Sequence, residues 1–198
     1  MKLVSSIKTK LDSSELLQRI MKAIIFGIGG SVGSRVLKMI SGVIISRILG
    51  KETYGQFSMV NSTVTLFVTF SGIGVGATLT RYVALYRQTP KKIGNIIGTL
   101  STFVGLLSVI VSLFLLLFAE HLSFWVSGSD VLSTYFKITS FTIFFTVLGS
   151  IQQSILLGME KYKNSAKIEL VQYGIYVVLS GLLSAWKGIN GAIWALLI

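Results

Sequence analysis

Residues 47–87 read RILGKETYGQFSMVNSTVTLFVTFSGIGVGATLTRYVALYR, and this stretch decides the fold. An apolar helix ends at its start, a polar corner follows between Gly50 and Gly55, and residues 57–80 form a second apolar run without a charged side chain. Glycine adopts the backbone angles that a reversing chain requires. The stretch therefore predicts a helical hairpin with a tight corner at residues 50–55 and a basic exit.

Each arm of this hairpin is long enough to cross a membrane, which takes about 20 apolar residues in a helix. Apolar segments of this kind are predicted at residues 23–46, 57–80, 94–119, 132–157, 168–186 and 189–198. The last segment stops at Ile198 and is too short to span, so we expect the sixth helix to be truncated. The pattern predicts an all-α, polytopic transmembrane helix bundle.

The composition agrees with a membrane protein. Hydrophobic residues make up 52% of the chain and charged residues 13%, whereas about a quarter of the residues in a soluble domain are charged. No soluble domain remains outside the apolar segments, which argues against nucleic-acid binding despite the net charge of +11. Because the chain has no cysteine and one histidine, we expect no disulfide, no metal site and no cofactor.

The basic residues alternate between the two sides of the predicted bundle. Twelve of the eighteen lie in the N-terminal region or in alternate loops: Lys2, Lys8, Lys10, Arg19, Lys22, Arg81, Arg87, Lys91, Lys92, Lys161, Lys163 and Lys167. Short loops that are rich in Lys and Arg stay in the cytoplasm, so we expect a cytoplasmic N-terminus. Residues 1–22 then form a cytoplasmic amphipathic segment, and residues 23–198 form the membrane domain.

Two basic residues, Arg35 and Lys38, lie inside the first apolar segment. A charged side chain at the centre of a membrane helix costs about 2.5 to 3.5 kcal/mol to insert, and it normally faces water or a partner. Arg35 is near the middle of residues 23–46, so we expect it at mid-depth in the membrane. We interpret the pair as part of a cationic cavity that binds an anionic substrate.

The spacing of three residues places both cations on one helix face, and Ser31, Ser34, Ser41 and Gly42 are predicted on that face as well. An alternative is a structural ion pair, although only Glu169 among the first five segments offers a carboxylate. A different position of the helix boundary is a second alternative.

Four further polar residues are secondary candidates for the cavity: Arg81, Gln152, Gln153 and Glu169. For the glutamines, hydrogen bonding between helices is the commoner use in membranes. The sequence offers neither a nucleophile with a positioned base nor a pair of catalytic carboxylates. We therefore do not expect an enzyme.

Three stretches carry a family resemblance: SRILGKETYGQFSMVNSTVTLF at residues 46–67, SGIGVGATLTRYVALYR at 71–87 and ILLGMEKYKNSAKIELV at 155–171. The first contains the pattern R-x-L-G-x-x-x-Y-G, and the second contains G-x-G-x-x-x-x-x-R-Y. Together they resemble the polysaccharide-export branch of the multidrug/oligosaccharidyl-lipid/polysaccharide exporter superfamily, which includes O-antigen flippases. The resemblance covers residues 23–198.

The resemblance implies a two-lobed helix bundle around a central cavity, of which this chain matches the first lobe. The implied substrate is a polyprenyl-diphosphate-linked oligosaccharide, such as an O-antigen, capsule or exopolysaccharide repeat unit, moved across the bacterial inner membrane. Implied partners are this lipid-linked anionic oligosaccharide, membrane lipids, and polysaccharide polymerases or glycosyltransferases.

Two other functions remain open at this point. A drug or cation antiporter of the same superfamily would be expected to carry an acidic residue inside the first lobe, and the first four segments contain none. A non-transporting scaffold of a polysaccharide assembly complex would not depend on Arg35 or Lys38.

Overall fold

The computed structural model describes the backbone of residues 2–72 and 74–197, and the side chains of residues 21, 25, 27, 29–72, 74–89 and 91–197. The described backbone is almost entirely helical and contains no strand, which confirms the predicted all-α bundle. The elements are α1 (Lys2–Ser71), α2 (Val75–Tyr86), α3 (Pro90–Leu117), α4 (Ala119–Ser127), the 3-10 helix η1 (Asp130–Leu132), α5 (Ser133–Gly158), α6 (Tyr162–Lys187) and α7 (Ile189–Ala195).

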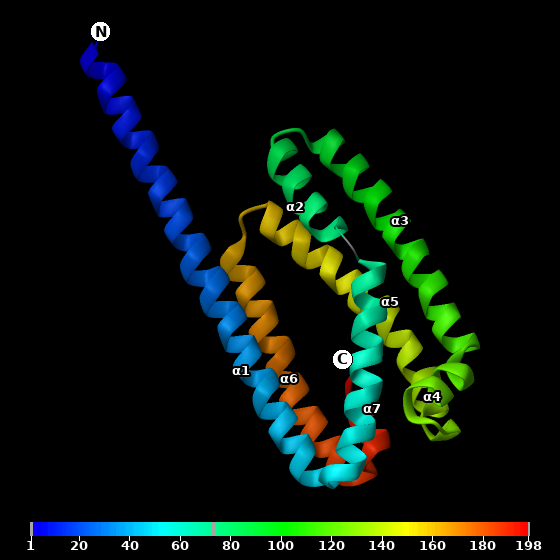
Figure 1. Cartoon of the computed structure of the whole chain (residues 1–198). Helices are drawn as coiled ribbons and strands as arrows, with labels where there is room; N and C mark the ends of the chain where they lie inside the picture. Colours follow the sequence, from blue (N-terminus) through cyan, green and yellow to red (C-terminus); the bar gives the residue numbers. More distant parts are fainter. Residues whose placement is uncertain (1, 73, 198) are drawn as a thin grey trace.

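The hairpin lies within α1, which doubles back at Gly50 (Figure 1). Gly50 has φ 75° and ψ 173°, a conformation that side chains with a Cβ resist. The predicted corner over residues 50–55 was wrong in length, because the helix resumes at Lys51 and a single glycine makes the turn. The two arms of α1, residues 2–49 and 51–71, diverge from this bend.

The second predicted segment is not one continuous helix. It is interrupted after Ser71, and α2 begins at Val75 behind Gly74, whose φ is 72°. The glycines at 72 and 74 supply the backbone freedom for this break. Beyond it α2 continues to Tyr86, past the predicted end at residue 80.

Three described helices are long and apolar enough to cross a membrane, namely Lys91–Leu117, Asp130–Gly158 and Tyr162–Lys187. A fourth candidate is the bent pair formed by α1 and α2, if it makes one broken span. These helices overlap the predicted segments, whereas α4 and η1 were not predicted. The count of six spans stays a prediction.

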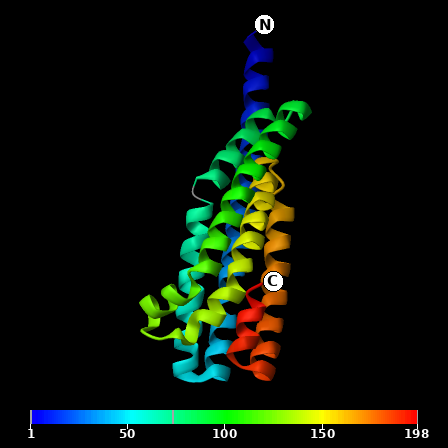
Figure 2. The same ribbon diagram turned by 90° about the vertical axis from the view of Figure 1, so that its right-hand side faces the viewer.

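The helices pack as two groups. The first arm of α1 lies beside α6, and their contact includes Gly30 against Ala166 and a buried hydrogen bond of 2.9 Å between the hydroxyls of Ser41 and Ser180 (Figures 1 and 2). Small residues let membrane helices approach this closely. The second arm of α1 packs with α2, α3 and α5 around a hydrophobic cluster that includes Phe136.

A smaller hydrophobic cluster sits at the bend and joins the two groups. It consists of Ile45, Phe57, Ala192 and Ile193, contributed by both arms of α1 and by α7. The bend is therefore held by packing on both of its arms, and not by the glycine alone.

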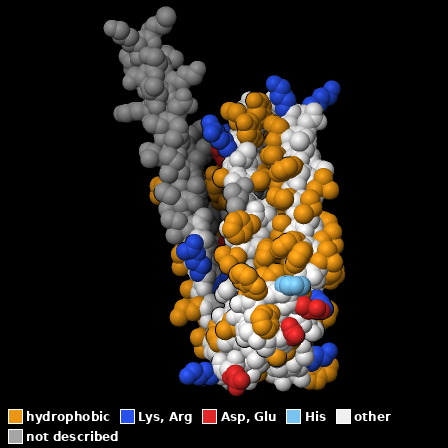
Figure 3. Space-filling model, turned by 45° about the vertical axis from the view of Figure 1, so that its right-hand side comes forward, with side chains coloured by type: hydrophobic (Ala, Val, Ile, Leu, Met, Phe, Trp, Pro, Cys, Tyr) orange, Lys and Arg blue, Asp and Glu red, His pale blue; other side chains and the backbone are white. Residues whose placement is uncertain are grey.

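Many charged side chains lie toward the two ends of the molecule, a Lys/Arg group lies between them on one side, and hydrophobic side chains cover most of the remaining surface (Figure 3). At one end Arg87 pairs with Glu160 at 2.6 Å, and at the other Lys137 pairs with Glu120 at 2.8 Å. Large apolar side chains such as Phe70 and Leu182 are exposed within the band. This distribution is that of a protein whose middle faces lipid.

Candidate functional site

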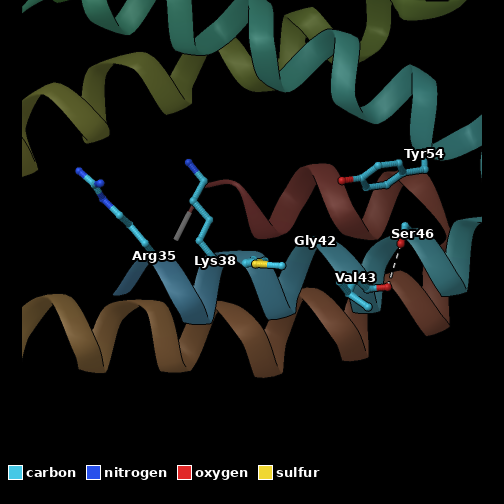
Figure 4. A pocket seen from close by; sticks show the side chains of 7 residues that line it. Arg35, Lys38, Gly42, Val43, Ser46 and Tyr54 are labelled. Atoms are coloured by element: carbon cyan, nitrogen blue, oxygen red, sulfur yellow. Dashed lines mark hydrogen bonds between the residues drawn. The ribbon is translucent and has the colours of Figure 1, made fainter. Parts of the chain in front are cut away.

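A groove of about 400 Å³ lies inside the α1 hairpin. Six lining residues come from the first arm and one from the second: Arg35, Lys38, Met39, Gly42, Val43, Ser46 and Tyr54. The cations occupy one end of the groove, and Tyr54 closes the end nearest the bend (Figure 4). The sequence prediction that Arg35 and Lys38 share a helix face is therefore met by the structure.

Arg35 and Lys38 extend into the groove on the side of α1 that faces away from α6 (Figure 4). Both side chains are exposed, and neither forms an ion pair within 4 Å of any described carboxylate. The alternative of a structural pair with Glu169 is thus absent from the described part of the chain. Two unpaired cations beside each other repel, and a bound anion relieves that repulsion.

The serines predicted beside the cations lie elsewhere. Ser34 is 5% exposed and Ser41 is fully buried, and both face α6. The reason is the helical period, which rotates Ser34 by about 100° from Arg35 and brings it into the tight contact with α6. Ser31 is half-buried and its carbonyl accepts the Ser34 hydroxyl at 3.0 Å. Met39 and Val43 line the groove in their place.

Ser34 belongs to a polar cluster that joins three helices, formed by Ser34 of α1, Gln153 of α5, and Ser165 and Glu169 of α6. The Ser34 hydroxyl donates to Glu169 Oε2 at 3.4 Å, and Gln153 Nε2 donates to Glu169 Oε1 at 2.8 Å. Gln153 Nε2 also lies 2.6 Å from the Ser165 hydroxyl. We call these four residues the polar clasp. It brings together three sequence candidates, but outside the groove.

The polar clasp also shows at which level of α6 Arg35 lies. Glu169 is the seventh residue after the start of α6 at Tyr162, or about 10 Å along the helix, and about 27 Å separate it from Lys187. Arg35 follows Ser34 directly and therefore lies nearer the start of α6 than its end. Because α6 begins inside the bundle, below the ends of α2 and α3 (Figure 1), the mid-depth position of Arg35 stays a prediction.

Two secondary candidates, Arg81 and Gln152, are exposed and do not line this groove. A second groove of about 300 Å³ lies between α2 and α3 and is lined by Thr78, Tyr82, Asn95, Ile96, Thr99 and Leu100. It contains no charged side chain, so it offers less to an anion than the groove inside the hairpin. Among the described residues, no group of three or more His, Cys, Asp or Glu side chains could hold a metal ion.

The sequence did not connect Tyr54 with Arg35 or Lys38. In the structure its hydroxyl reaches across to the first arm, where a Cβ built on Gly42 would lie 3.5 Å from the oxygen. Tyr54 reaches the groove only through the tertiary structure, because the bend at Gly50 folds it back over Gly42, twelve positions earlier in the chain.

Comparison with known proteins gives one result. No curated protein and no solved structure matched the chain. A family model described as "Polysaccharide biosynthesis protein" matches residues 20–198, which cover both arms of the hairpin beyond the N-terminal region and all later helices. This membrane protein therefore belongs to the polysaccharide biosynthesis protein family.

Proposed function

We propose that this protein moves a polyprenyl-diphosphate-linked oligosaccharide, such as an O-antigen, capsule or exopolysaccharide repeat unit, across the bacterial inner membrane. Membership of the polysaccharide biosynthesis family supports a role in lipid-linked polysaccharide transport. The observation that carries the proposal is that two cations, Arg35 and Lys38, lie at one end of the groove inside the α1 hairpin with no ion-pair partner among the described side chains.

A lipid diphosphate combines a charged head with an apolar tail, and its head is costly to move through hydrocarbon. Charge-assisted hydrogen bonds from a guanidinium and an ammonium offset that cost, and the guanidinium suits two phosphate oxygens at once. The groove offers these donors in a recess between helices, while the apolar band outside it suits the prenyl tail. The transporter accordingly needs no nucleophile or metal.

The distribution of basic residues favours loading from the cytoplasmic leaflet. The end of the bundle at which α2 meets α3 carries Arg87, Lys91 and Lys92 (Figure 1). By the positive-inside rule this end is cytoplasmic, as is the N-terminus. A substrate made on the cytoplasmic side then meets the cations before it reaches the closed end of the groove at Tyr54.

Alternating access is the mechanism that this arrangement supports best. The two arms of α1 diverge from a bend packed by its own hydrophobic cluster, and they belong to two different helix groups. A change in the angle between the groups would open or close the groove at the cationic end. The polar clasp is the side-chain contact that holds α5 to α1 and α6 near that end.

The test is complementation of a bacterial strain that lacks its flippase for surface polysaccharide. The full-length gene product with Arg35→Ala should restore little surface polysaccharide, and lipid-linked repeat units should accumulate on the cytoplasmic leaflet. Lys167→Ala removes an exposed cation of α6 that does not line the groove, and it should complement normally. Normal export by the Arg35→Ala protein, or energy-dependent export of a cationic dye by the wild type, would overturn the proposal.

A further inference from the structure

The end of the groove opposite Arg35 is built from an aromatic ring and a glycine. The Tyr54 ring packs against the hydrophobic cluster at the bend, with its centroid 6.1 Å from that of Phe57. Its hydroxyl points over Gly42 and forms no hydrogen bond with a described residue. Tyr54 is thus a ring fixed on one side, with a free polar group directed into the groove.

The positions of the lining residues along the first arm determine which part of a ligand each of them can contact. Arg35 and Lys38 are about 4.5 Å apart along the helix axis, which is the scale of a diphosphate. Gly42 lies about 6 Å further toward the bend, and Ser46 about 6 Å beyond that. One of the two groups attached to a diphosphate held by the cations therefore falls over Gly42 and beside Tyr54.

We propose that Tyr54 and Gly42 form a subsite for the first sugar of the lipid-linked substrate, an inference that rests on the proposed function. A hexose has an apolar ring face and a rim of hydroxyls, and binding sites commonly combine aromatic surface with a few polar groups. Tyr54 supplies both, because it presents a ring and an unpaired hydroxyl. Gly42 supplies the space, since it carries no side chain where the sugar lies.

The apolar residues in the middle of the groove agree with a diphosphate site at one end and a sugar subsite at the other. Met39 and Val43 line the middle of the groove and offer a surface without hydrogen-bonding groups. The Ser46 hydroxyl donates its hydrogen to the carbonyl of Val43 at 2.9 Å, so toward a ligand it can act only as an acceptor. Tyr54 is therefore the side chain of this end that can both donate to a sugar and stack on it.

The experiment compares two probes that differ by one sugar, geranyl diphosphate and geranyl diphosphoglucose, on the purified full-length protein. Wild type, Tyr54→Ala, Tyr54→Phe and Arg35→Ala are measured by calorimetry or by quenching of intrinsic fluorescence. Tyr54→Ala should weaken binding of the glucose-bearing probe about tenfold and leave the sugar-free probe within about twofold. Tyr54→Phe should lose only part of that preference. Tyr82→Ala, which alters the other groove, is the matched control.

The outcomes separate the two proposals. If Arg35→Ala weakens both probes while Tyr54→Ala weakens only the glucose-bearing one, the subsite is supported. If Tyr54→Ala weakens both equally or neither, the sugar subsite is overturned while the diphosphate site stands. If the wild type binds neither probe, or Arg35→Ala changes neither affinity, the proposed function fails and the subsite fails with it.

Discussion

The hydroxyl of Ser34 lies 3.4 Å from the carboxylate of Glu169, so these two residues stand at the same level of α1 and α6. It also separates Glu169 from Arg35, which the sequence offered as an alternative ion pair. Glu169 is occupied by Ser34 and Gln153 on one side of α1, whereas Arg35, the next residue, extends from a different face into the groove. The cations are left without a described carboxylate partner because helix packing turns the acid to the opposite side.

We expect the two cations of the groove to differ in their tolerance of substitution. Arg35→Lys keeps the charge but loses the planar fork that binds two oxygens, so transport should fall severalfold without being abolished. Arg35→Ala should reduce substrate affinity by about 10- to 100-fold, the equivalent of one lost charge-assisted hydrogen bond. The measurement is the initial rate of lipid-diphosphate flipping in proteoliposomes. Equal rates for the Lys and Ala variants would contradict a role for the guanidinium geometry.

A second prediction uses the empty space at Gly42. A Cβ there would make ordinary contact with the Tyr54 hydroxyl at 3.5 Å, so Gly42→Ala should fold normally and retain most transport. Gly42→Leu places a larger side chain across the groove and should block transport, although leucine favours the helix more than glycine does. Membrane abundance and thermal stability of the two variants should match. Wild-type transport by Gly42→Leu would exclude the groove as the path of the substrate.

The orientation can be tested by cysteine labelling, because the chain contains no native cysteine. Single cysteines at Glu52 and Asp130, both exposed, should react with a membrane-impermeant maleimide added to intact cells with a permeabilised outer membrane. Cysteines at Lys91 and Lys163, exposed at the other end, should react only after the inner membrane is opened. The reverse pattern would place the N-terminus outside and remove the argument for cytoplasmic loading.

The polar clasp should contribute measurably to stability. Gln153→Ala and Glu169→Ala each remove one side of a 2.8 Å hydrogen bond between α5 and α6, and their effects on the free energy of unfolding should not add. Hydrogen bonds between membrane helices contribute about 0.6 kcal/mol on average, so a coupling energy of about 0.5 to 1.5 kcal/mol is expected. Denaturation of all four proteins of the double-mutant cycle in detergent gives this value. A coupling energy of zero would mean that the hydrogen bond between Gln153 and Glu169 does not stabilise the protein.

The clasp and the groove also make separable predictions about transport. Glu169→Gln keeps a polar side chain of the same size whose single amide oxygen can still accept from Gln153, so its stability should be closer to wild type than that of Glu169→Ala. Because Glu169 does not line the groove, affinity for geranyl diphosphate should be unchanged in Glu169→Gln. An affinity loss as large as that of Arg35→Ala would show that the clasp belongs to the binding site.

The sequence by itself determined that this is a helical membrane protein, that the chain reverses within residues 50–55, and that Arg35 and Lys38 share one helix face. These properties are local, since apolar length, glycine conformation and helical period depend on neighbours in the chain. The break between Ser71 and Val75 was also within reach of the sequence, because Gly72 and Gly74 stand there, but an uninterrupted apolar run concealed it.

Only the tertiary structure decided which residues meet. It turned Ser34 and Ser41 toward α6, engaged Glu169 with Gln153, and brought Tyr54 over Gly42 at the end of the groove that starts at the cations. The physical reason is that these relationships depend on the rotation and the sliding of one helix against another. Close packing between small residues fixes both, and no periodicity within a single helix encodes them.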